Sequence, residues 1–206
     1  DPEYVNEMSQ HGFDPHLDLA KHAGEITQKQ IDQHNSGVID LKALRKDYKV
    51  VNYSATYGVG AAKLSRETGM TRDKAQDLLD AYWKRNWSVK EFSESQPIRH
   101  IDGEMWIQNP VSKFWHSLRF EKDAFSTINQ STGSYCFDRW VALYRLNRPN
   151  IIGQFHDESI NTVKEGYENE HTNVLKRAIK ILNDQLKLNV DLGIDVQYGK
   201  NYAEVH

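Results

Sequence analysis

The spacing of hydrophobic residues separates a helical first part of the chain from a second part of mixed character. Along most of residues 1–95, apolar positions recur every three or four residues, which places them on one face of a helix. After residue 95, short alternating segments typical of strands stand between two long helical patterns. The pattern predicts an α+β protein.

The predicted helices of the first part have recognisable ends. Glycines and N-cap residues delimit a short N-terminal helix, a helix from about His16 to Gly24, a helix from Asp40 to Gly58, one over residues 60–69, and one that Thr71 caps. Between the second and third of these, residues 35–37 predict a turn. The core stripe of the helix from Asp40 is predicted to be Leu44, Tyr48, Val51 and Ala55.

The second part is predicted to contain a hairpin around Asp102-Gly103, because apolar and polar residues alternate on both sides of that turn sequence. Helical spacing covers residues 126–146 and 172–186. Between them, two β-type runs flank the polar centre of "NIIGQFHDESINTV", residues 150–163. The alternation in "LGIDVQYG", residues 192–199, predicts a final strand.

The composition is that of a globular protein, with 27% charged and 38% hydrophobic residues in 206. No apolar run reaches the ~18–20 residues of a membrane span, and the N-terminus lacks the basic and apolar regions of a signal peptide. The single cysteine, Cys136, excludes an internal disulfide framework and a zinc site of several cysteines. We therefore expect a cytoplasmic protein without membrane contact, in the host cytoplasm if it is viral.

Basic residues concentrate between residues 42 and 66, although the formal net charge of the whole chain is −3. Within this segment Arg45, Lys49, Tyr53 and Tyr57 follow one another at intervals of four, and Gly58 ends the row. Four residues turn about 400° around a helix axis, so the two cations and the two rings line one face.

Two interpretations of this row stay open from the residues alone. Exposed cations four residues apart are commonly a solvated helix surface, with nearby tyrosines packed on the core. Alternatively, the cations bind a triphosphate, the rings form a platform for a sugar and a base, and the glycine permits close approach of the backbone. The order of cations and rings along the helix matches the order of parts in a nucleotide.

The row Arg45-x3-Lys49-x3-Tyr53-x3-Tyr57-Gly58 resembles the nucleotide-binding motif of the fingers helix in family A DNA polymerases, the DNA polymerase I family. The segment "FHDES" is similar to the metal-binding turn of a palm hairpin in that family. Resemblance extends to "DPEYVNEMSQHGFDPH", to "STINQSTG" and to the closing "GIDVQYGKNYAEVH", which ends in His206. It thus covers essentially the whole chain and is closest to phage replicases.

The resemblance implies that residues 1–95 form the fingers and residues 96–206 part of the palm. It places a deoxynucleotide on the fingers helix, where Arg45 binds the γ-phosphate, Lys49 bridges the α- and γ-phosphates, and His16 contacts the phosphates. Lys49 is also implied to protonate the departing pyrophosphate. Tyr53 stacks on sugar and base, which implies tolerance of dideoxynucleotides.

The resemblance assigns further roles around the template and the metals. Tyr57, with Gly58 beside it, packs where the templating base enters. Asp157 binds one or both of two Mg²⁺ ions, with Glu158 next to it in the catalytic group. Contacts to primer-template DNA are implied for Gln130, which reads the minor groove, and for His156 and Lys122.

The chain departs from the family in two places. The family's hairpin commonly has Gly-Arg where this sequence has Gly103-Glu104, so a backbone contact to DNA is not expected there. The first palm motif, whose aspartate bridges both metals, has no counterpart in this sequence. Another segment or polypeptide is therefore expected to supply that motif, the thumb and any exonuclease, and this chain alone is expected to be inactive.

Three functions remain to be compared. The first is a portion or subunit of a DNA-directed DNA polymerase, a nucleotidyltransferase that acts in DNA replication. The second is a non-catalytic module that binds nucleotides or nucleic acid, against which the metal turn at Asp157 argues. The third is a fragment of a single-subunit RNA polymerase, which shares the row, whereas Glu158 and the helix of Gln130 favour the DNA enzyme.

Overall fold

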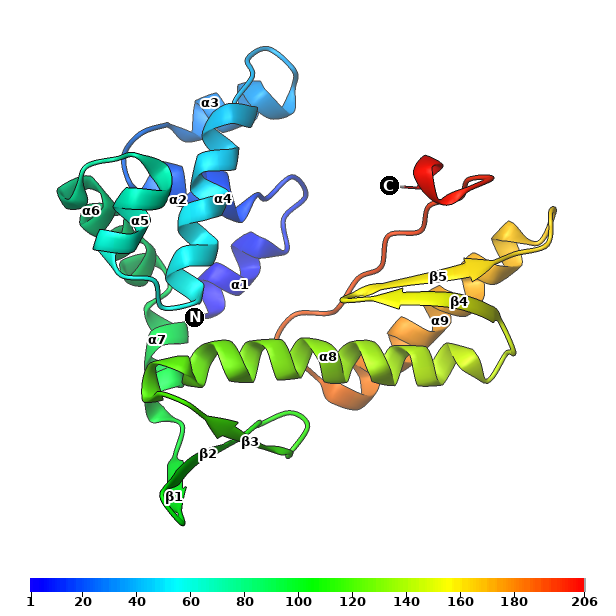
Figure 1. The fold of residues 1–206 in the computed structure, drawn as a ribbon. Helices are drawn as coiled ribbons and strands as arrows, with labels where there is room; N and C mark the ends of the chain where they lie inside the picture. The colour runs from blue at the N-terminus through cyan, green and yellow to red at the C-terminus, as the bar shows by residue number, and fades with distance from the viewer. Residues whose placement is uncertain (206) are drawn as a thin grey trace. The chain divides into compact units, whose positions relative to one another are not determined.

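The computed structural model describes residues 1–205, so the predicted tail residue His206 lies outside the described residues. The chain forms two compact units, residues 1–108 with 114–128 and residues 109–113 with 129–206. Helices and two small antiparallel sheets build them, which confirms the predicted α+β class (Figure 1). The first sheet belongs to the first unit, so these compact units have other limits than the fingers and palm part expected at residues 1–95 and 96–206, and that division stays a prediction.

Helices dominate the first unit, and a three-stranded sheet follows them. Its elements are α1 (Pro2–Met8), α2 (Pro15–His22), α3 (Gln28–Asn35), α4 (Lys42–Thr56), α5 (Ala61–Thr68), α6 (Arg72–Arg85), α7 (Trp87–Ser95), β1 (Ile98–Ile101), β2 (Glu104–Gln108), β3 (Trp115–Leu118) and the 3-10 turn η1 (Glu121–Asp123). Within residues 1–205, no helix is long and apolar enough to cross a membrane.

Side-chain caps define where several of these helices begin. Asp1 accepts hydrogen bonds from two backbone N–H groups at the start of α1, and Asp14 does the same at the start of α2. Thr71 caps α6, as predicted. The predicted cap of α4 was wrong by one residue: Leu41 holds that position, and Asp40 accepts the N–H of the first helical residue at 2.8 Å.

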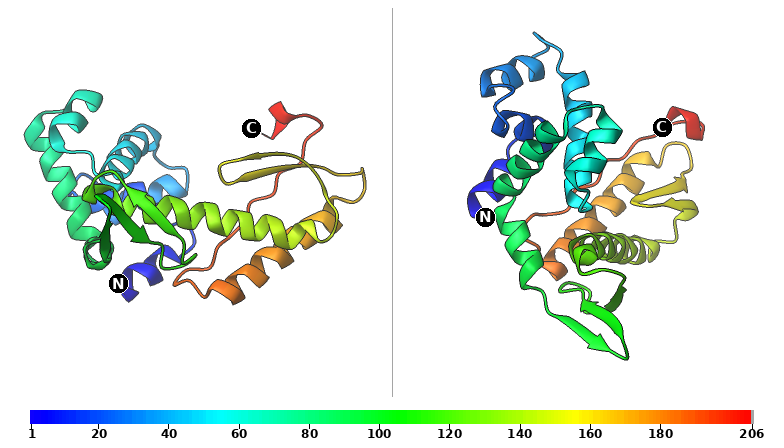
Figure 2. Two further views of the ribbon diagram at one scale, coloured as in Figure 1. Left: turned by 60° about the horizontal axis from the view of Figure 1, so that its bottom comes forward. Right: turned by 60° about the vertical axis from the view of Figure 1, so that its left-hand side comes forward.

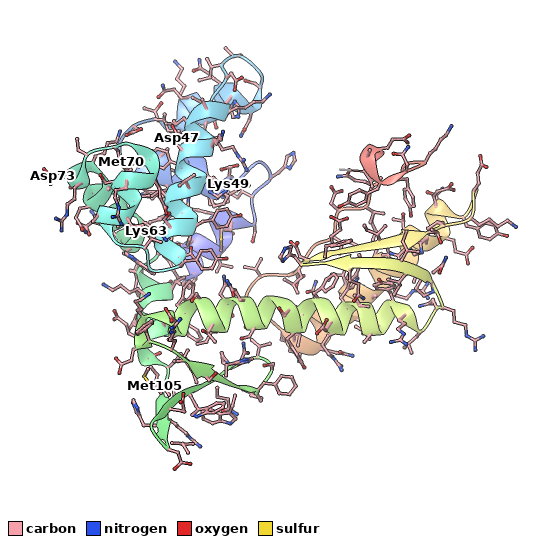
Figure 3. The ribbon with its side chains drawn as sticks, viewed as in Figure 1. Asp47, Lys49, Lys63, Met70, Asp73 and Met105 are labelled. Carbon is pink, nitrogen blue, oxygen red and sulfur yellow. The ribbon has the colours of Figure 1, made fainter. Side chains whose placement is uncertain are left out.

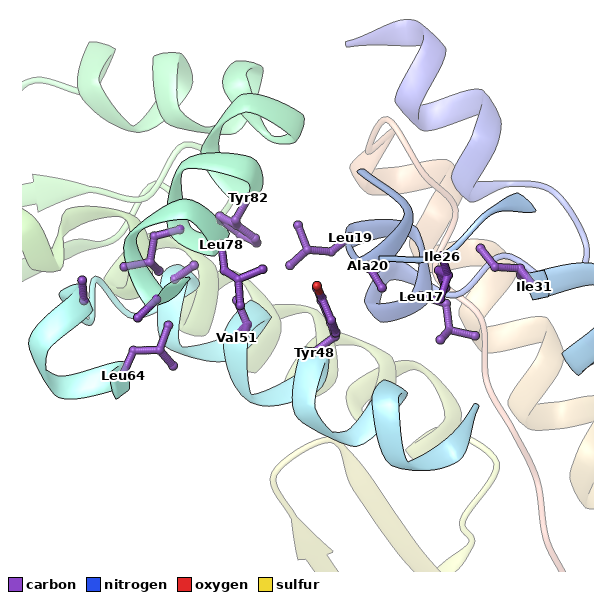
Figure 4. Packing of buried hydrophobic residues seen from close by; sticks show 14 residues of the cluster. Leu17, Leu19, Ala20, Ile26, Ile31, Tyr48, Val51, Leu64, Leu78 and Tyr82 are labelled. Carbon is purple, nitrogen blue, oxygen red and sulfur yellow. The ribbon is translucent and has the colours of Figure 1, made fainter. Parts of the chain in front are cut away.

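Helices α2, α4, α5 and α6 enclose the core of the first unit. Figure 4 shows side chains of α2, α4 and α6 converging there, among them Leu19, Tyr48, Val51, Leu78 and Tyr82. The predicted stripe on α4 is confirmed, since Tyr48, Val51 and Ala55 are buried and Leu44 packs partly buried against the same core. Burying this face of α4 leaves its opposite face to solvent.

A charged cluster joins α1, α2 and α6. Asp18 is almost fully buried, and Arg85 donates from Nε to its Oδ2 at 2.8 Å. Arg85 also pairs with Glu7 and lies over the ring of Tyr4, 4.1 Å from its centroid. Burial and the nearby Asp18 raise the pKa of Tyr4 to about 12, so this ring stays neutral at pH 7. The cluster compensates the charge of Asp18 and fixes α2 against α6.

The predicted hairpin is confirmed, and a third strand extends it. β1 and β2 pair antiparallel, and the two turn residues have positive φ, 51° at Asp102 and 82° at Gly103. Asp-Gly favours such a turn because glycine adopts positive φ without strain. β3 pairs with β2, and one face of this sheet packs on Ala124 and Ile128 at the start of α8 (Ala124–Arg145).

The second unit joins two helices to a hairpin (Figure 2). After the larger part of α8 come β4 (Asn150–Phe155), β5 (Glu158–Thr162), α9 (Glu168–Leu186) and the 3-10 turn η2 (Tyr202–Glu204). Trp140 of α8 packs on α9 and donates from Nε1 to the carbonyl oxygen of Leu175 at 3.3 Å. Tyr144 of α8 is fully buried and its hydroxyl is hydrogen-bonded to that of Ser159 in β5. This bond holds the hairpin on α8.

The predicted final strand was wrong. Residues 191–199 form no strand, although Ile194 and Val196 do pack on the core of the second unit. The backbone of Leu192 is bonded instead to a side chain of α9: Asn183 Nδ2 donates to its carbonyl at 3.0 Å, and Asn183 Oδ1 accepts its N–H at 2.9 Å. Alternating burial therefore arises here without a partner strand.

Candidate nucleotide-binding site

The solvent face of α4 presents the predicted row of cations and rings. Lys49 is exposed, as Figure 3 shows, and its Nζ lies 5.7 Å from the centroid of the Tyr53 ring. Tyr53 and Tyr57 expose 51% and 45% of their surface, so neither ring belongs to the core. Exposure of this extent contradicts the interpretation in which the tyrosines pack inside. The row is an accessible surface of two cations and two rings.

Arg45 is held in place by the N-cap of another helix. Its Nε donates to Asp14 Oδ2 at 2.5 Å, while Asp14 Oδ1 accepts the N–H groups of His16 and Leu17. Burial alone would raise the pKa of the Asp14 carboxyl, but the Leu17 N–H, the Arg45 guanidinium and the His16 N–H together lower it. Asp14 is therefore ionised at pH 7. Within the described chain only Nε of Arg45 is engaged, which leaves its terminal nitrogens for a ligand.

His16 lies beside this pair, at the start of α2. It is 9% exposed, and its ring centroid is 6.1 Å from that of Tyr53. Burial lowers the pKa of His16, and the positive charges of Arg45 and Lys49 lower it further against the opposing effect of Asp14. Histidine titrates near 6.5 without such influences, so His16 is neutral at pH 7.

Gly58 ends the row because the backbone there turns out of the helix. Its φ is +68°, its N–H bonds to the carbonyl of Ala55 at 3.0 Å, and the N–H of Val59 bonds to that of Ser54 at 2.8 Å. These two bonds form a Schellman motif, in which the residue after the cap adopts positive φ. Tyr57 is that cap residue, so its ring stands at the very end of α4.

The second candidate group lies at the β4–β5 turn. His156 and Asp157 are the two turn residues between Phe155 and Glu158, which pair across the hairpin. Both turn residues are exposed, His156 has a φ of +51°, and Glu158 is half-buried. In residues 1–205 the carboxylate of Asp157 makes no hydrogen bond or ion pair, and nowhere do three or more His, Cys, Asp or Glu side chains form a metal-binding group.

The two residues expected to contact DNA elsewhere differ in their surroundings. Gln130 is exposed on α8, next to Ser131 and Thr132, whose hydroxyls both accept from the side chain of buried Asn109 at 2.7 and 2.8 Å. Lys122 is exposed in η1, and its Nζ lies 3.2 Å from Asp123 Oδ1. The neighbouring carboxylate neutralises part of the charge expected to attract DNA at Lys122.

The predicted residues thus fall into two groups, one in each unit. His16, Arg45, Lys49 and Tyr53 lie together in the first unit, and His156, Asp157 and Glu158 lie together in the second. Two features were not predicted from the sequence: the contact of Asn52 with His16 and the pairing of Asp14 with Arg45. Asn52 directly precedes Tyr53 inside the motif, and this position was the one indication in the sequence that Asn52 belongs to the site.

Comparison with known proteins identifies the family. A family model described as DNA polymerase family A matches residues 1–105, just over half of the chain, and this match includes all of α4. The chain belongs to DNA polymerase family A. This confirms the family inferred from the row on α4.

Relatives of this family A chain match it along most of its length. DNA polymerase I of Borreliella burgdorferi is 22% identical over 94% of the chain, and the thermostable DNA polymerase I of Thermus filiformis is 23% identical over 81%. The chain spans only 22% and 21% of these two proteins. The polymerase domain of Pol1 from M. smegmatis, solved with DNA primer-template and dNTP, superposes with a TM-score of 0.73 at 19% identity, over all of this chain and 36% of that one. This last likeness establishes the fold.

Proposed function

We propose that the chain is a C-terminal portion or subunit, of the phage-replicase type, of a DNA-directed DNA polymerase that adds deoxynucleotides to a primer 3′ end. Residues 1–95 correspond to the fingers and residues 96–206 to part of the palm. Another segment or chain supplies the first palm-motif carboxylate, the thumb and any exonuclease. Primer-template DNA and deoxynucleotides are the other partners.

The exposed row on α4 carries this proposal. Transfer of a nucleotidyl group builds negative charge on the leaving pyrophosphate, and positioned cations stabilise that charge. Arg45 and Lys49 provide these cations. Arg45 offers a planar guanidinium held by Asp14, and Lys49 offers a point charge on a flexible side chain. Tyr53 and Tyr57 offer accessible ring faces to sugar and base.

Asp157 is the residue of this chain best suited to hold Mg²⁺. Magnesium prefers oxygen ligands and binds through one or two carboxylates together with substrate phosphates, so an exposed carboxylate without an internal partner fits. When bound, a pair of such ions activates the primer hydroxyl and stabilises the leaving group. Glu158, half-buried on β5, adds negative charge beside the turn, and His156 contacts the primer terminus.

The test is primer extension by the assembly captured from its native source through a tag on this chain. We expect Mg²⁺-dependent extension that is lost with Asp157→Asn and kept with Asp138→Asn, which alters an exposed carboxylate on α8 of the same unit. Absence of extension from the unmodified capture, with nucleotide or DNA still bound, would support the non-catalytic binding module instead.

A further inference from the structure

We propose that Asn52 of α4 is a positioning residue that fixes the single proton of the neutral His16 ring on Nε2, so that His16 donates this N–H to a phosphate oxygen. The position of the proton is a property of the ring alone. Donation to a phosphate rests on the proposed function, because it requires a phosphate at the row on α4.

Two carbonyl oxygens and one ring nitrogen lie within hydrogen-bond distance of one atom of the Asn52 amide. Its Nδ2 lies 3.2 Å from the carbonyl oxygen of Tyr48, 3.4 Å from that of Pro15 and 3.1 Å from His16 Nδ1. A carbonyl oxygen can only accept a hydrogen bond, so the amide atom that faces two of them is the NH2 nitrogen. With the amide reversed, its oxygen would face two oxygens at these distances. The neighbours therefore determine the orientation of Asn52.

The proton of the His16 ring follows from this orientation. Because the Asn52 NH2 donates toward Nδ1, that nitrogen keeps its lone pair free to accept. A neutral imidazole has one N–H group, which then lies on Nε2. Only 9% of His16 is exposed, so water competes little for these bonds. The ring can thus approach a phosphate oxygen as a donor only through Nε2.

Burial is the main reason why the ring is neutral, and the charged groups around it act in opposite directions. Arg45 and Lys49 on α4 disfavour a third positive charge, whereas Asp14, before α2, favours it. Burial is the largest influence and lowers the pKa of His16. A protonated ring would also turn its Nδ1–H toward the NH2 of Asn52. A neutral His16 would give the phosphate a directional hydrogen bond, while Arg45 and Lys49 supply the positive charge.

The ring nitrogens can be observed directly by ¹⁵N–¹H correlation NMR of the 206-residue chain at pH 8. We expect His16 Nδ1 to be unprotonated and Nε2 protonated. Asn52→Asp should move a proton onto Nδ1, and Asn52→Leu should give a mixture of both forms. His34, whose Nδ1 faces the N–H of Leu41, should be unchanged in both variants and reports that the fold is intact. A protonated Nδ1 in the unsubstituted chain would overturn the proposal without any variant.

The phosphate half is tested with inorganic tripolyphosphate, which has no sugar or base. Glutamine carries its NH2 near the position of Nε2 and asparagine near that of Nδ1. His16→Gln should therefore keep tripolyphosphate affinity within about twofold, and His16→Asn should lose about tenfold, the effect of one hydrogen bond to a charged group. Equal affinity in both variants would overturn this half. No binding by the unsubstituted chain would instead count against the proposed nucleotide site, while the NMR result still decides the position of the proton.

Discussion

At the scale of single residues, Asp14 connects the two helices that carry the candidate site. One of its oxygens caps α2 and the other holds Arg45 of α4, so a local cap also orients a distant guanidinium. Lys49, one turn further along α4, has no such ion pair in residues 1–205 and leans only toward the ring of Tyr53. The two cations therefore differ in their partners, a carboxylate for Arg45 and an aromatic ring for Lys49.

Lys49→Ala should lower nucleotide incorporation by the captured assembly about tenfold or more, because one charge-assisted bond to phosphate is lost. Binding of primer-template DNA should change little. Lys46→Ala is the matched control, since Lys46 is exposed on the same helix outside the row and should leave both quantities unchanged. An equal loss of incorporation and DNA binding in Lys49→Ala would contradict its role at the phosphates.

Tyr53→Phe should raise discrimination against dideoxynucleotides, measured as the ratio of kcat/KM for deoxy- and dideoxynucleotide. The ring remains, and the change removes only a hydroxyl that makes no hydrogen bond within the described chain. Fold stability should therefore stay the same. If the ratio does not change either, Tyr53 does not border the sugar.

At the scale of elements, the end of α4 depends on a glycine and its beginning is tied to α2. The positive φ of Gly58 allows the Schellman motif that stops the helix after Tyr57. Asp14 couples the cap of α2 to α4 through Arg45. The contribution of the Schellman motif and of the Asp14–Arg45 ion pair can each be tested by measuring the stability of the fold.

Gly58→Ala should destabilise the chain by about 1–2 kcal/mol, the cost of an L-residue in the left-handed region. Space is not limiting, because the nearest atom to an added Cβ is the Lys122 carbonyl oxygen at 3.8 Å. Gly60→Ala provides the comparison: φ there is −79° and no atom lies within 4 Å, so only the weaker capping of α5 by alanine should shift denaturant unfolding, and by less than at Gly58. Equal shifts would show that the left-handed turn at Gly58 contributes nothing.

Asp14→Asn should lower the free energy of unfolding at pH 7 and have little effect at pH 2. The pKa of Asp14 is lower in the folded chain than its ordinary value, so its charge stabilises the fold above the unfolded pKa of about 3.9 and this contribution is lost as pH falls through the folded pKa. Loss of a cap alone costs about 0.5–2 kcal/mol, and asparagine retains part of it. A difference independent of pH would rule out the charge of Asp14 as the cause.

At the scale of the whole molecule, the two candidate groups belong to different compact units. The candidate phosphate-binding group is built on helices of the first unit, and the candidate metal-binding turn belongs to a hairpin of the second. We expect activity of an assembly, in which another segment or chain supplies the first palm-motif carboxylate that the proposed function requires.

The purified 206-residue chain should not extend a primer with Mg²⁺, and the captured assembly should do so with deoxynucleotides in preference to ribonucleotides. The measurement is the ratio of extension rates with the two nucleotide types at equal concentration. Preference for ribonucleotides would favour the RNA polymerase alternative. Extension by the chain alone would refute the need for a carboxylate from elsewhere.

The sequence by itself determined the elements that depend on local spacing. Periodicity near 3.6 residues defined both faces of α4 and Gly58 marked its end, so the row followed without any tertiary information, whereas the exposure of Tyr53 and Tyr57 was decided by the structure. The Asp102-Gly103 hairpin was equally predictable, because the turn type depends on those two residues. The helices α3 and α7 and the strand β3 were missed, since all three are short.

Only the tertiary structure decided which distant groups meet. Asp14 and Arg45 are 31 residues apart, and His16 and Asn52 are 36 apart, so no spacing rule connects them. Residues 191–199 are a second example. Their alternation indicated that one side is buried, but it did not indicate that the Asn183 side chain would hydrogen-bond the backbone of Leu192 in place of a partner strand. Local pattern specifies which face of a segment is buried, whereas packing of the whole chain specifies what lies against that face.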